Sequence, residues 1–315
     1  ILGRAYSGAG DAMRAVDVLQ RATAEAELQI GPNGRTVAFI RSNLARAQRR
    51  AGLLLAALPN HDMSIAVFSE QFEPQSVQPA LALSSRGATL LHLRRASAAA
   101  SDLALAADWL TKTQGVRHQN TLIARAQLAH ARALQGEAAA AVRSLQELEA
   151  IATQPATRGL ISHSLGAALR LHGDPAAAIA AQSAALHHYG DDPSVALERA
   201  MAQVEIALAY VALDQPAAAL SALAEALPRL EKLQADPTPV QAEAWLAKGR
   251  ALIATGQPAE AIGPLASAAA YWQTRRSAAG DQDSKAWHRE CTLWLTRART
   301  SAAHQSGPRR PQPRS

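Results

Sequence analysis

The sequence of 315 residues has little of what a β-sheet or a disulfide framework needs. It contains 5 Trp, 4 Tyr, 3 Phe and a single cysteine, Cys291, whereas alanine occurs 75 times. A lone cysteine has no partner for an intrachain disulfide, which excludes a disulfide-stapled scaffold. Because alanine is the best helix former and strand formers are scarce, the composition favours an all-helical protein. The hydrophobic share of 48% is enough for a core, so wholesale disorder is also excluded.

Long hydrophobic runs are absent as well. The longest, at about residues 52–58, is far shorter than the roughly 18 residues of a membrane-spanning helix. The first residues lack the basic start and apolar stretch of a secretory signal. The chain opens with Ile1 rather than Met, so we expect a further segment upstream.

Catalytic motifs are missing too. The sequence has no phosphate-binding loop of the GxxxxGK type, no GxSxG elbow and no HExxH. His288 and Cys291 are three residues apart on an expected helix, but no second His or Cys lies near them in the sequence, so we expect a structural role rather than a metal site. We therefore expect neither an enzyme active site nor a cofactor or metal within these residues.

Lysine is scarce, since 28 of the 32 basic residues are arginine, and the net charge is +6. The planar guanidinium suits phosphate groups, which would fit a nucleic-acid partner. However, arginine and alanine enriched together also fit codon bias in a GC-rich genome, and the positive charge is spread along the chain. A nucleic-acid partner is therefore disfavoured.

An internal repeat organises the chain. Seven turn positions, here called the anchors, are separated by 42, 42, 42, 37, 41 and 42 residues. The residue seven before each anchor is always Gly or Ala, and the residue five after each anchor is always Ala. The anchors are Gly10, Gly52, Arg94, Gly136, Gly173, Asp214 and Gly256.

This pattern is typical of paired helices. A small residue in the middle of the first helix lets the second helix approach closely, and Gly at the anchor supplies a positive φ at no steric cost. A single hairpin cannot bury its apolar face, so the hairpins must stack. Arg94 stands where a glycine is expected, and we expect that turn to be looser than the others.

The small–small–Ala signature, as in Leu165-Gly166, Gly173 and Ala178, resembles that of the tetratricopeptide repeats over roughly residues 1–273. The period near 42 resembles the longer-helix variety found in kinesin light chains. The resemblance implies an all-α, right-handed α-solenoid of about seven helical hairpins. We expect the repeat array at residues 1–273, with its first repeat truncated, then a polar loop and a capping helix at 274–304, and a disordered basic tail at 305–315.

In that family the first helix of each hairpin lines a concave groove that binds peptides. Carried over to this sequence, the groove is basic at both ends and apolar between, which would suit a protein or peptide partner with acidic groups and one apolar anchor. Asn43 also resembles the family's Asn that reaches the backbone of bound peptides. That ladder is largely missing here, because the equivalent positions are Ser85, Gln127, Ser164, Glu205 and Ala247. The candidate peptide-binding residues are Ser42, Asn43, Arg46, Arg49, Arg50, His92, His130, His163, Arg170 and Arg250.

In its Ala-, Arg- and Leu-rich composition, its long repeats and its truncated start, the chain resembles the C-terminal repeat region of bacterial signalling proteins such as membrane-tethered serine/threonine kinases. That resemblance implies a sensing or docking region. The alternatives are the sensor half of a transcription regulator with an upstream DNA-binding domain, or a free-standing adaptor. We expect a cytoplasmic location for the chain as given, and an extracytoplasmic one if it is attached to a membrane-spanning kinase.

Overall fold

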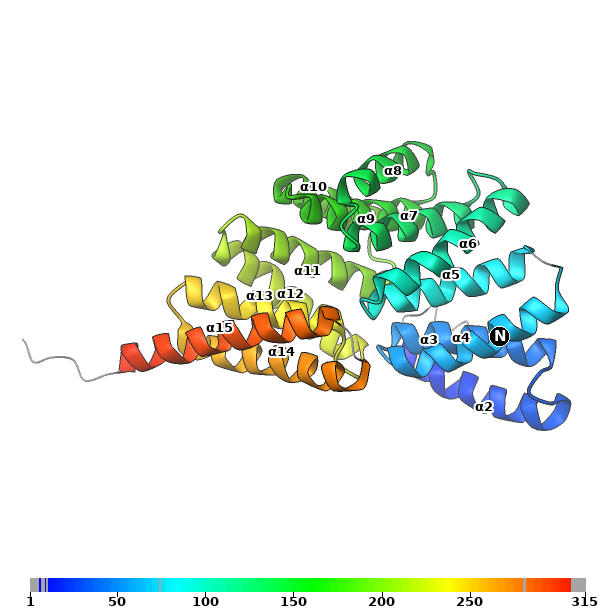
Figure 1. The fold of residues 1–315 in the computed structure, drawn as a ribbon, viewed down its shortest axis with the longest axis horizontal. Helices are drawn as coiled ribbons and strands as arrows, with labels where there is room; N and C mark the ends of the chain where they lie inside the picture. Colours follow the sequence, from blue (N-terminus) through cyan, green and yellow to red (C-terminus); the bar gives the residue numbers. More distant parts are fainter. Residues whose placement is uncertain (1–5, 7–8, 10, 74, 280–281, 307–315) are drawn as a thin grey trace, which may run out of the picture.

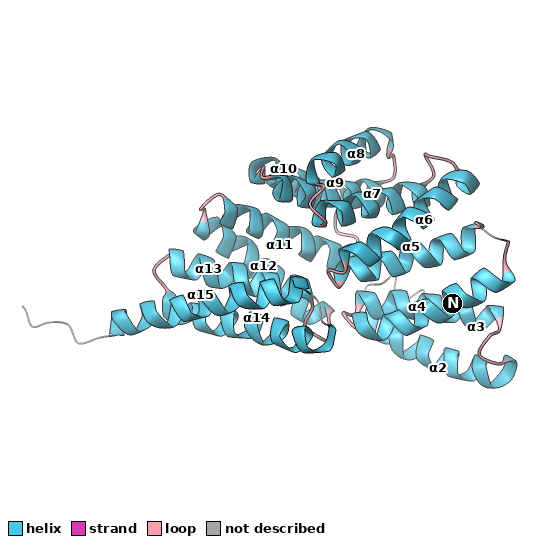
Figure 2. Ribbon diagram, in the orientation of Figure 1, coloured by secondary structure: helices cyan, strands magenta, loops and turns pink. Residues whose placement is uncertain are grey.

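The computed structural model describes residues 6, 9, 11–73, 75–279 and 282–306. Within them the chain is a succession of α-helices joined by short turns, with one short 3-10 helix, η1, at Pro193–Val195 (Figure 2). The α-helices are α2 (Ala12–Ile30), α3 (Arg35–Arg50), α4 (Leu54–Gln71), α5 (Val77–His92), α6 (Ala96–Gln114), α7 (Gln119–Leu134), α8 (Ala138–Ile151), α9 (Pro155–His172), α10 (Pro175–Tyr189), α11 (Ala196–Ala212), α12 (Pro216–Leu233), α13 (Pro239–Ala254), α14 (Pro258–Ala279) and α15 (Gln282–Ser306).

The helices form hairpins whose turns fall at the predicted anchors. Each pair from α3/α4 to α13/α14 is joined at one anchor, and α2 is the second helix of the first hairpin. Glycine anchors take positive φ values, for example 79° at Gly52 and 93° at Gly173. Gly10 lies outside the described residues.

Arg94 and Asp214 adopt the same left-handed conformation as the glycine anchors, with φ of 59° and 54°. The turn at Arg94 is also closed by the same pair of backbone hydrogen bonds as the turn at Gly52: Arg94 N donates to Leu91 O at 2.9 Å, and Arg95 N donates to Leu90 O at 2.9 Å. The expectation of a looser turn is therefore wrong. A left-handed arginine costs about 1–2 kcal/mol, so this turn needs a compensating interaction.

The small residues inside the first helices are explained by the packing of each hairpin. A Cβ added to Gly87 would lie 2.6 Å from Leu103 of the paired helix, and one added to Gly249 would lie 2.3 Å from Leu265. No side chain fits at such distances, so glycine sets the close approach of the two helices. The predicted alanines on the second helices are buried, as at Ala99, which is fully buried.

The hairpins follow a curved path that brings distant repeats together. Figure 1 shows α2–α6 on one side and α11–α15 on the other, with α7–α10 across the top. The turn after α3 touches the connection between α12 and α13, where Ala235 N donates a hydrogen bond to Ala51 O at 2.8 Å. A Cβ on Gly52 would lie 2.9 Å from the Cβ of Gln234, so this contact is tight. The array therefore closes into a ring of hairpins.

A buried ion-pair network holds a second contact across the ring. Arg94 donates from Nε and Nη2 to the two carboxylate oxygens of Glu243 on α13, at 2.6 and 2.5 Å. Glu205 on α11 lies 3.9 Å from Arg94 and accepts a hydrogen bond from Arg170 Nε at 2.8 Å. We call this set of residues, Arg94, Glu243, Glu205 and Arg170, the closure network. Its ion pairs are the interaction that compensates for the left-handed conformation of Arg94.

The C-terminal end is covered by α15, which packs against α13 and α14. Trp272 and Trp287 stack with ring centroids 5.7 Å apart. Cys291 is fully buried in the same cluster, and this burial raises its pKa to about 12.

The expected polar loop begins later than predicted. Residues 274–279, expected to be its start, instead continue helix α14 to Ala279, because they are residues that a helix accepts. The tail at 307–315 lies outside the described residues. No helix among the described residues is long and apolar enough to cross a membrane.

Candidate functional site

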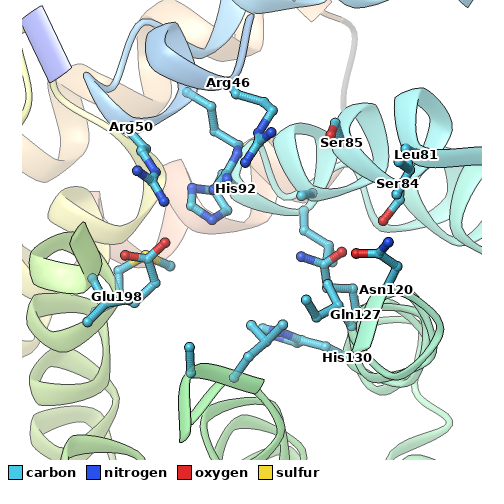
Figure 3. A pocket seen from close by; sticks show the side chains of 18 of the residues that line it. Arg46, Arg50, Leu81, Ser84, Ser85, His92, Asn120, Gln127, His130 and Glu198 are labelled. Atoms are coloured by element: carbon cyan, nitrogen blue, oxygen red, sulfur yellow. The ribbon is translucent and has the colours of Figure 1, made fainter. Parts of the chain in front are cut away.

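The ring encloses a cavity of about 590 Å³. Its wall is built mainly by the first helices of successive hairpins, α3, α5, α7 and α9, and it is completed by the start of α11 and the connection before α13 (Figure 3). The volume lies in the range of small-ligand pockets, about 300–1,000 Å³. Equivalent positions of successive first helices line the cavity. Residues of similar chemistry therefore form rows that run across the wall from helix to helix.

The first row is apolar. Five residues, each thirteen before the anchor of its own hairpin, line the cavity and are all large and hydrophobic. In the hairpin of α13 the same position is Glu243, which joins the closure network instead. The apolar row consists of Phe39, Leu81, Ile123, Leu160 and Met201.

The second row carries amides and hydroxyls, four residues further along each helix. Asn43, Ser85, Gln127 and Ser164 occupy it, and all four line the cavity. Asn43 donates to the carbonyl of Phe39 at 2.8 Å, whereas Gln127 Oε1 and Ser164 Oγ are buried without a hydrogen-bond partner in the structure. Glu205, at the equivalent position of α11, belongs to the closure network.

Besides the two rows, the wall has a basic zone toward the end of α3. Arg46, Arg49 and Arg50 line the cavity there, and Glu198 from the start of α11 faces Arg50 in Figure 3. Among the described residues of the cavity wall, Glu198 is the one carboxylate, and its Oε2 is buried without a partner. Burial lowers the pKa of Arg49 to about 10, with Arg50 and Arg46 adding to the effect and Glu198 opposing it.

Asp192 stands near this basic zone but outside the cavity wall. Its backbone and side-chain hydrogen bonds with Ser194 lower its pKa, and the charge of Arg50 adds to that effect. Asp192 is exposed to solvent, so water screens its interaction with the arginine. The wall itself therefore carries more positive than negative charge.

Three histidines complete the wall. His130 and His163 lie on neighbouring helices with ring centroids 6.2 Å apart, and His163 Nδ1 hydrogen-bonds Gln182 Oε1 at 3.0 Å. Burial, followed by the charges of His163 and Arg94, lowers the pKa of His130 to about 3. Burial also lowers the pKa values of His92 and His163. The imidazoles are therefore neutral at pH 7 and add hydrogen-bonding groups but no charge.

Buried polar atoms without a hydrogen-bond partner gather in this wall. Such atoms are costly unless a partner reaches them, so a cluster of them in a cavity marks a place for a polar ligand or for water. His130 and Tyr189 are 9% and 5% exposed, so their unpartnered atoms are deep in the wall. The atoms are Arg49 Nε, Gln127 Oε1, His130 Nε2, Ser164 Oγ, Tyr189 OH and Glu198 Oε2.

The structure brings together eight of the ten residues that the sequence indicated as peptide-binding. They come from α3, α5, α7 and α9, and whether they bind a peptide stays a prediction. The eight are Ser42, Asn43, Arg46, Arg49, Arg50, His92, His130 and His163.

The other two candidates lie elsewhere. Arg170 is held by Glu205 in the closure network. Arg250 lies 5.1 Å over the ring of Trp294 and 3.4 Å from Glu290, so it belongs to the contact between α13 and α15. The prediction of a groove that is basic at both ends therefore needs correction, because the arginines of the cavity wall gather in one zone beside the ring closure.

Sequence reasoning missed the apolar row and Glu198. A signal for the row was present, since large apolar residues recur thirteen residues before five successive anchors. Glu198 gave no such signal. It comes from the first turn of α11, and only the closing of the ring places it opposite α3.

Comparison with known proteins shows the fold. No protein-family model and no curated protein matches the sequence. Among solved structures, a Rap protein complexed with competence and sporulation factor superposes with a TM-score of 0.56 over 96% of this chain and 97% of its own, at 11% identity. Cut9, in the APC/C hetero-tetramer Cut9–Hcn1, gives a TM-score of 0.61 over 94% of this chain and 48% of its own, at 16% identity.

A tetratricopeptide repeat protein from Parabacteroides merdae is also similar, with a TM-score of 0.49 at 14% identity over 92% of this chain and 96% of its own. The described helices and the superpositions on the Rap protein and Cut9, both with TM-scores above 0.5, show that the chain is an all-α, right-handed solenoid of tetratricopeptide-like hairpins, as the sequence predicted.

Proposed function

We propose that this chain binds an extended peptide segment in its central cavity. The observation that carries the proposal is the set of rows in the wall. An apolar row can hold side chains, and the neighbouring amide and hydroxyl row can hydrogen-bond a peptide backbone. Such a backbone offers both N–H donors and C=O acceptors, which the unpartnered Gln127, Ser164 and His130 atoms require.

Two solved structures with a similar fold contain a bound partner: the Rap protein holds competence and sporulation factor, and Cut9 is assembled with Hcn1. These partners support a protein or peptide as the partner of this chain. The excess of arginine in the wall adds a preference for acidic groups.

A pool of random octapeptides with free termini tests the proposal. The immobilised protein is incubated with the pool, and the retained peptides are identified by mass spectrometry. We expect enrichment of peptides that contain apolar residues and carboxylates. The variant Ser85→Trp places an indole in the second row and should abolish retention, whereas Ser101→Trp on the exposed face of α6 should leave it unchanged. Equal retention by both variants would refute binding in the cavity.

In this proposal the chain is the sensing or docking part of a larger signalling protein such as a serine/threonine kinase. A transcription regulator's sensor half and a free-standing adaptor are the competing contexts. The coding sequence upstream of Ile1 separates them, because a kinase signature, a helix-turn-helix module or a nearby start codon each selects one.

A further inference from the structure

We propose that Gln182 fixes which ring nitrogen of His163 carries the proton, so that His163 offers the cavity a hydrogen-bond acceptor and binds a backbone N–H of the peptide. The identity of the ligand rests on the proposed function, whereas the effect of Gln182 on His163 does not depend on it. Gln182 lies on α10 and does not line the cavity, so it is a positioning residue that acts through His163.

Gln182 departs from the repeat at a buried position. The residue nine after each anchor lies on the second helix of its hairpin and is leucine in five of the seven hairpins. Gln182 is fully buried there. A polar side chain in place of a buried leucine costs free energy unless its groups are hydrogen-bonded, so the amide needs partners inside the protein. The five leucines are Leu19, Leu103, Leu145, Leu223 and Leu265.

The other exception at this position, His61, has a different kind of partner. Its Nε2 hydrogen-bonds the hydroxyl of Thr89 on α5 at 3.0 Å, which joins the second hairpin to the third. Neither of these two residues lines the cavity. His61 is therefore a comparison for Gln182, since it is polar at the same position of the repeat and its contact holds two hairpins together.

The partner of Gln182 is His163, which uses both groups of the amide. Gln182 Nε2 donates to the backbone carbonyl of His163 at 3.0 Å, and Gln182 Oε1 lies 3.0 Å from His163 Nδ1. A carbonyl oxygen only accepts, so the amide nitrogen has to face it and the amide oxygen has to face Nδ1. That oxygen carries no hydrogen, so the contact is a hydrogen bond only if Nδ1 is protonated. In the neutral ring, Nε2 is then the acceptor.

Gly166 makes room for this arrangement. A Cβ added there would lie 2.6 Å from Gln182 Nε2 and 2.7 Å from its Cγ. At Gly87 and Gly249, the equivalent positions of two other hairpins, leucine fills the corresponding space. The glycine thus brings the amide of Gln182 against α9, about one turn from His163.

His163 Nε2 is available to a ligand. His163 lines the cavity, and its Nε2 makes no hydrogen bond to another described residue. The neighbouring His130 does not supply one, since its own Nε2 is buried without a partner. Burial lowers the pKa of His163, although Glu205 and the hydrogen bond with Gln182 oppose this effect, so the ring keeps its lone pair at pH 7.

A lone pair in the wall selects a hydrogen-bond donor. A carbonyl or carboxylate placed against His163 Nε2 would leave both acceptors without a hydrogen bond, which is costly in a buried site. Gln127 Oε1, on the neighbouring helix α7, is also a buried acceptor without a partner. This part of the wall therefore favours N–H groups, and a peptide backbone supplies them at regular intervals.

NMR of the imidazole nitrogens tests the effect of Gln182 directly. In ¹⁵N-labelled protein, long-range ¹H–¹⁵N correlations distinguish protonated from unprotonated ring nitrogens, and His163→Phe identifies the signals of His163. We expect a protonated Nδ1 and an unprotonated Nε2 in the wild type. Gln182→Leu installs the residue of the other hairpins, and the ring should then populate the Nε2–H tautomer that histidine favours in water. His61→Leu should leave the His163 signals in the wild-type pattern.

Peptides recovered from the octapeptide pool test whether the acceptor binds a donor. Each backbone N–H in turn is replaced by N–CH₃, and titration calorimetry measures the Kd. With the wild type we expect one position at which the replacement weakens the Kd by about tenfold, the loss of one hydrogen bond. With Gln182→Leu the same replacement should cost less than about threefold, whereas His61→Leu should keep the full loss. Thermal melting shows that both variants are folded.

The outcomes separate this inference from the proposed function. A protonated Nε2 in the wild type, or an unchanged tautomer in Gln182→Leu, would overturn the role of Gln182. If the tautomer changes but the N–CH₃ replacement is equally costly in Gln182→Leu, the contact with the peptide N–H is overturned while peptide binding stands. If affinity depends instead on a donor side chain of the peptide, the assignment to the backbone is overturned. If no octapeptide is retained, the proposed function and the peptide contact fail together, and NMR alone decides whether Gln182 fixes the tautomer.

Discussion

Arginines occur in two places inside the ring, and the carboxylates around them differ. In the closure network Arg94 and Arg170 face Glu243 and Glu205, two cations against two anions, all largely buried. Burial would raise the pKa of Glu205, but Arg170 and Arg94 lower it to about 2, so the network is ionised at neutral pH. In the cavity wall, Arg46, Arg49 and Arg50 share one lining carboxylate, Glu198.

The difference indicates two roles for one residue type. Buried charges that are matched by opposite charges hold two parts of a fold in register, although they add little net stability compared with apolar packing. Arginines that line a cavity can instead donate hydrogen bonds to an acidic ligand. The experiments below test whether the two sets of arginines can be separated, in order of decreasing effect.

Removing the anion of the closure network should give the largest effect. Glu243→Ala leaves Arg94 buried without its bidentate partner, and breaking a buried pair in this way costs about 3–5 kcal/mol of unfolding free energy. Urea denaturation followed by circular dichroism measures the change. The double variant Arg94→Gly/Glu243→Leu should recover most of the loss, because it removes both charges and the left-handed arginine. A loss below about 1 kcal/mol for Glu243→Ala would show that the network is not a closure.

Removing a positive charge from the cavity wall should weaken peptide binding but leave the free energy of unfolding nearly unchanged. Arg49→Gln eliminates a charge that burial disfavours, so the free energy of unfolding should change by less than about 0.5 kcal/mol or rise. Affinity for the recovered peptides should fall by about 1.5–3 kcal/mol, the cost of a lost hydrogen bond to a charged group. Denaturation and calorimetry on the same preparation test both halves. Strong destabilisation by Arg49→Gln would place it with the structural arginines.

Acidification should act on the cavity wall before it reaches the closure network. The folded-state pKa of His130 is about 3, below the ordinary value near 6.5, so the unfolded chain binds the proton first. Its contribution to stability is therefore complete above about pH 6.5 and is lost as the pH falls toward 3; at pH 5 the loss is about 2 kcal/mol. Glu205 with its pKa of about 2 is still ionised in this window.

The variant His130→Gln measures that contribution. Its stability should fall less steeply than that of the wild type between pH 7 and pH 5, as followed by thermal melting in buffers of equal ionic strength. Indistinguishable slopes would mean that His130 accepts a proton in the folded ring and that the wall is more hydrated than its burial indicates.

The smallest effect should come from the other non-glycine anchor. Asp214 has φ of 54° and makes no cross-ring ion pair among the described contacts, so Asp214→Gly should stabilise by about 0.5–1 kcal/mol through relief of left-handed strain. Arg94→Gly relieves the same strain but loses the pair with Glu243, and it should destabilise. Thermal melting of the two variants gives the comparison. If both substitutions changed the melting temperature in the same direction, the role assigned to the Arg94 side chain would be refuted.

Much of the fold could be predicted because it is set locally. The anchors and the glycines at positions such as 87 and 249 follow from turn geometry and helix spacing, which act over a few residues. Eight cavity residues could be indicated for the same reason, since the inner face of a first helix recurs with the repeat.

The parts that could not be predicted depend on contacts across the ring. Arg94 and Glu243 are 149 positions apart, and nothing in either local sequence marks them as partners. Small angles between hairpins accumulate along the array, and their sum decides whether the ends meet. Arg94 was consequently interpreted as a defect of a turn, and Arg170 as a groove residue.

The ring closure also limits how this array could have grown. Open solenoids tolerate the duplication or loss of a repeat, because each unit depends mainly on its immediate neighbours. Here an inserted hairpin between Arg94 and Glu243 would move the two residues apart by the width of a repeat and would separate Ala51 from Ala235. Copy number between these points is therefore fixed, and sequence change is expected to proceed by substitution in the wall rather than by adding repeats.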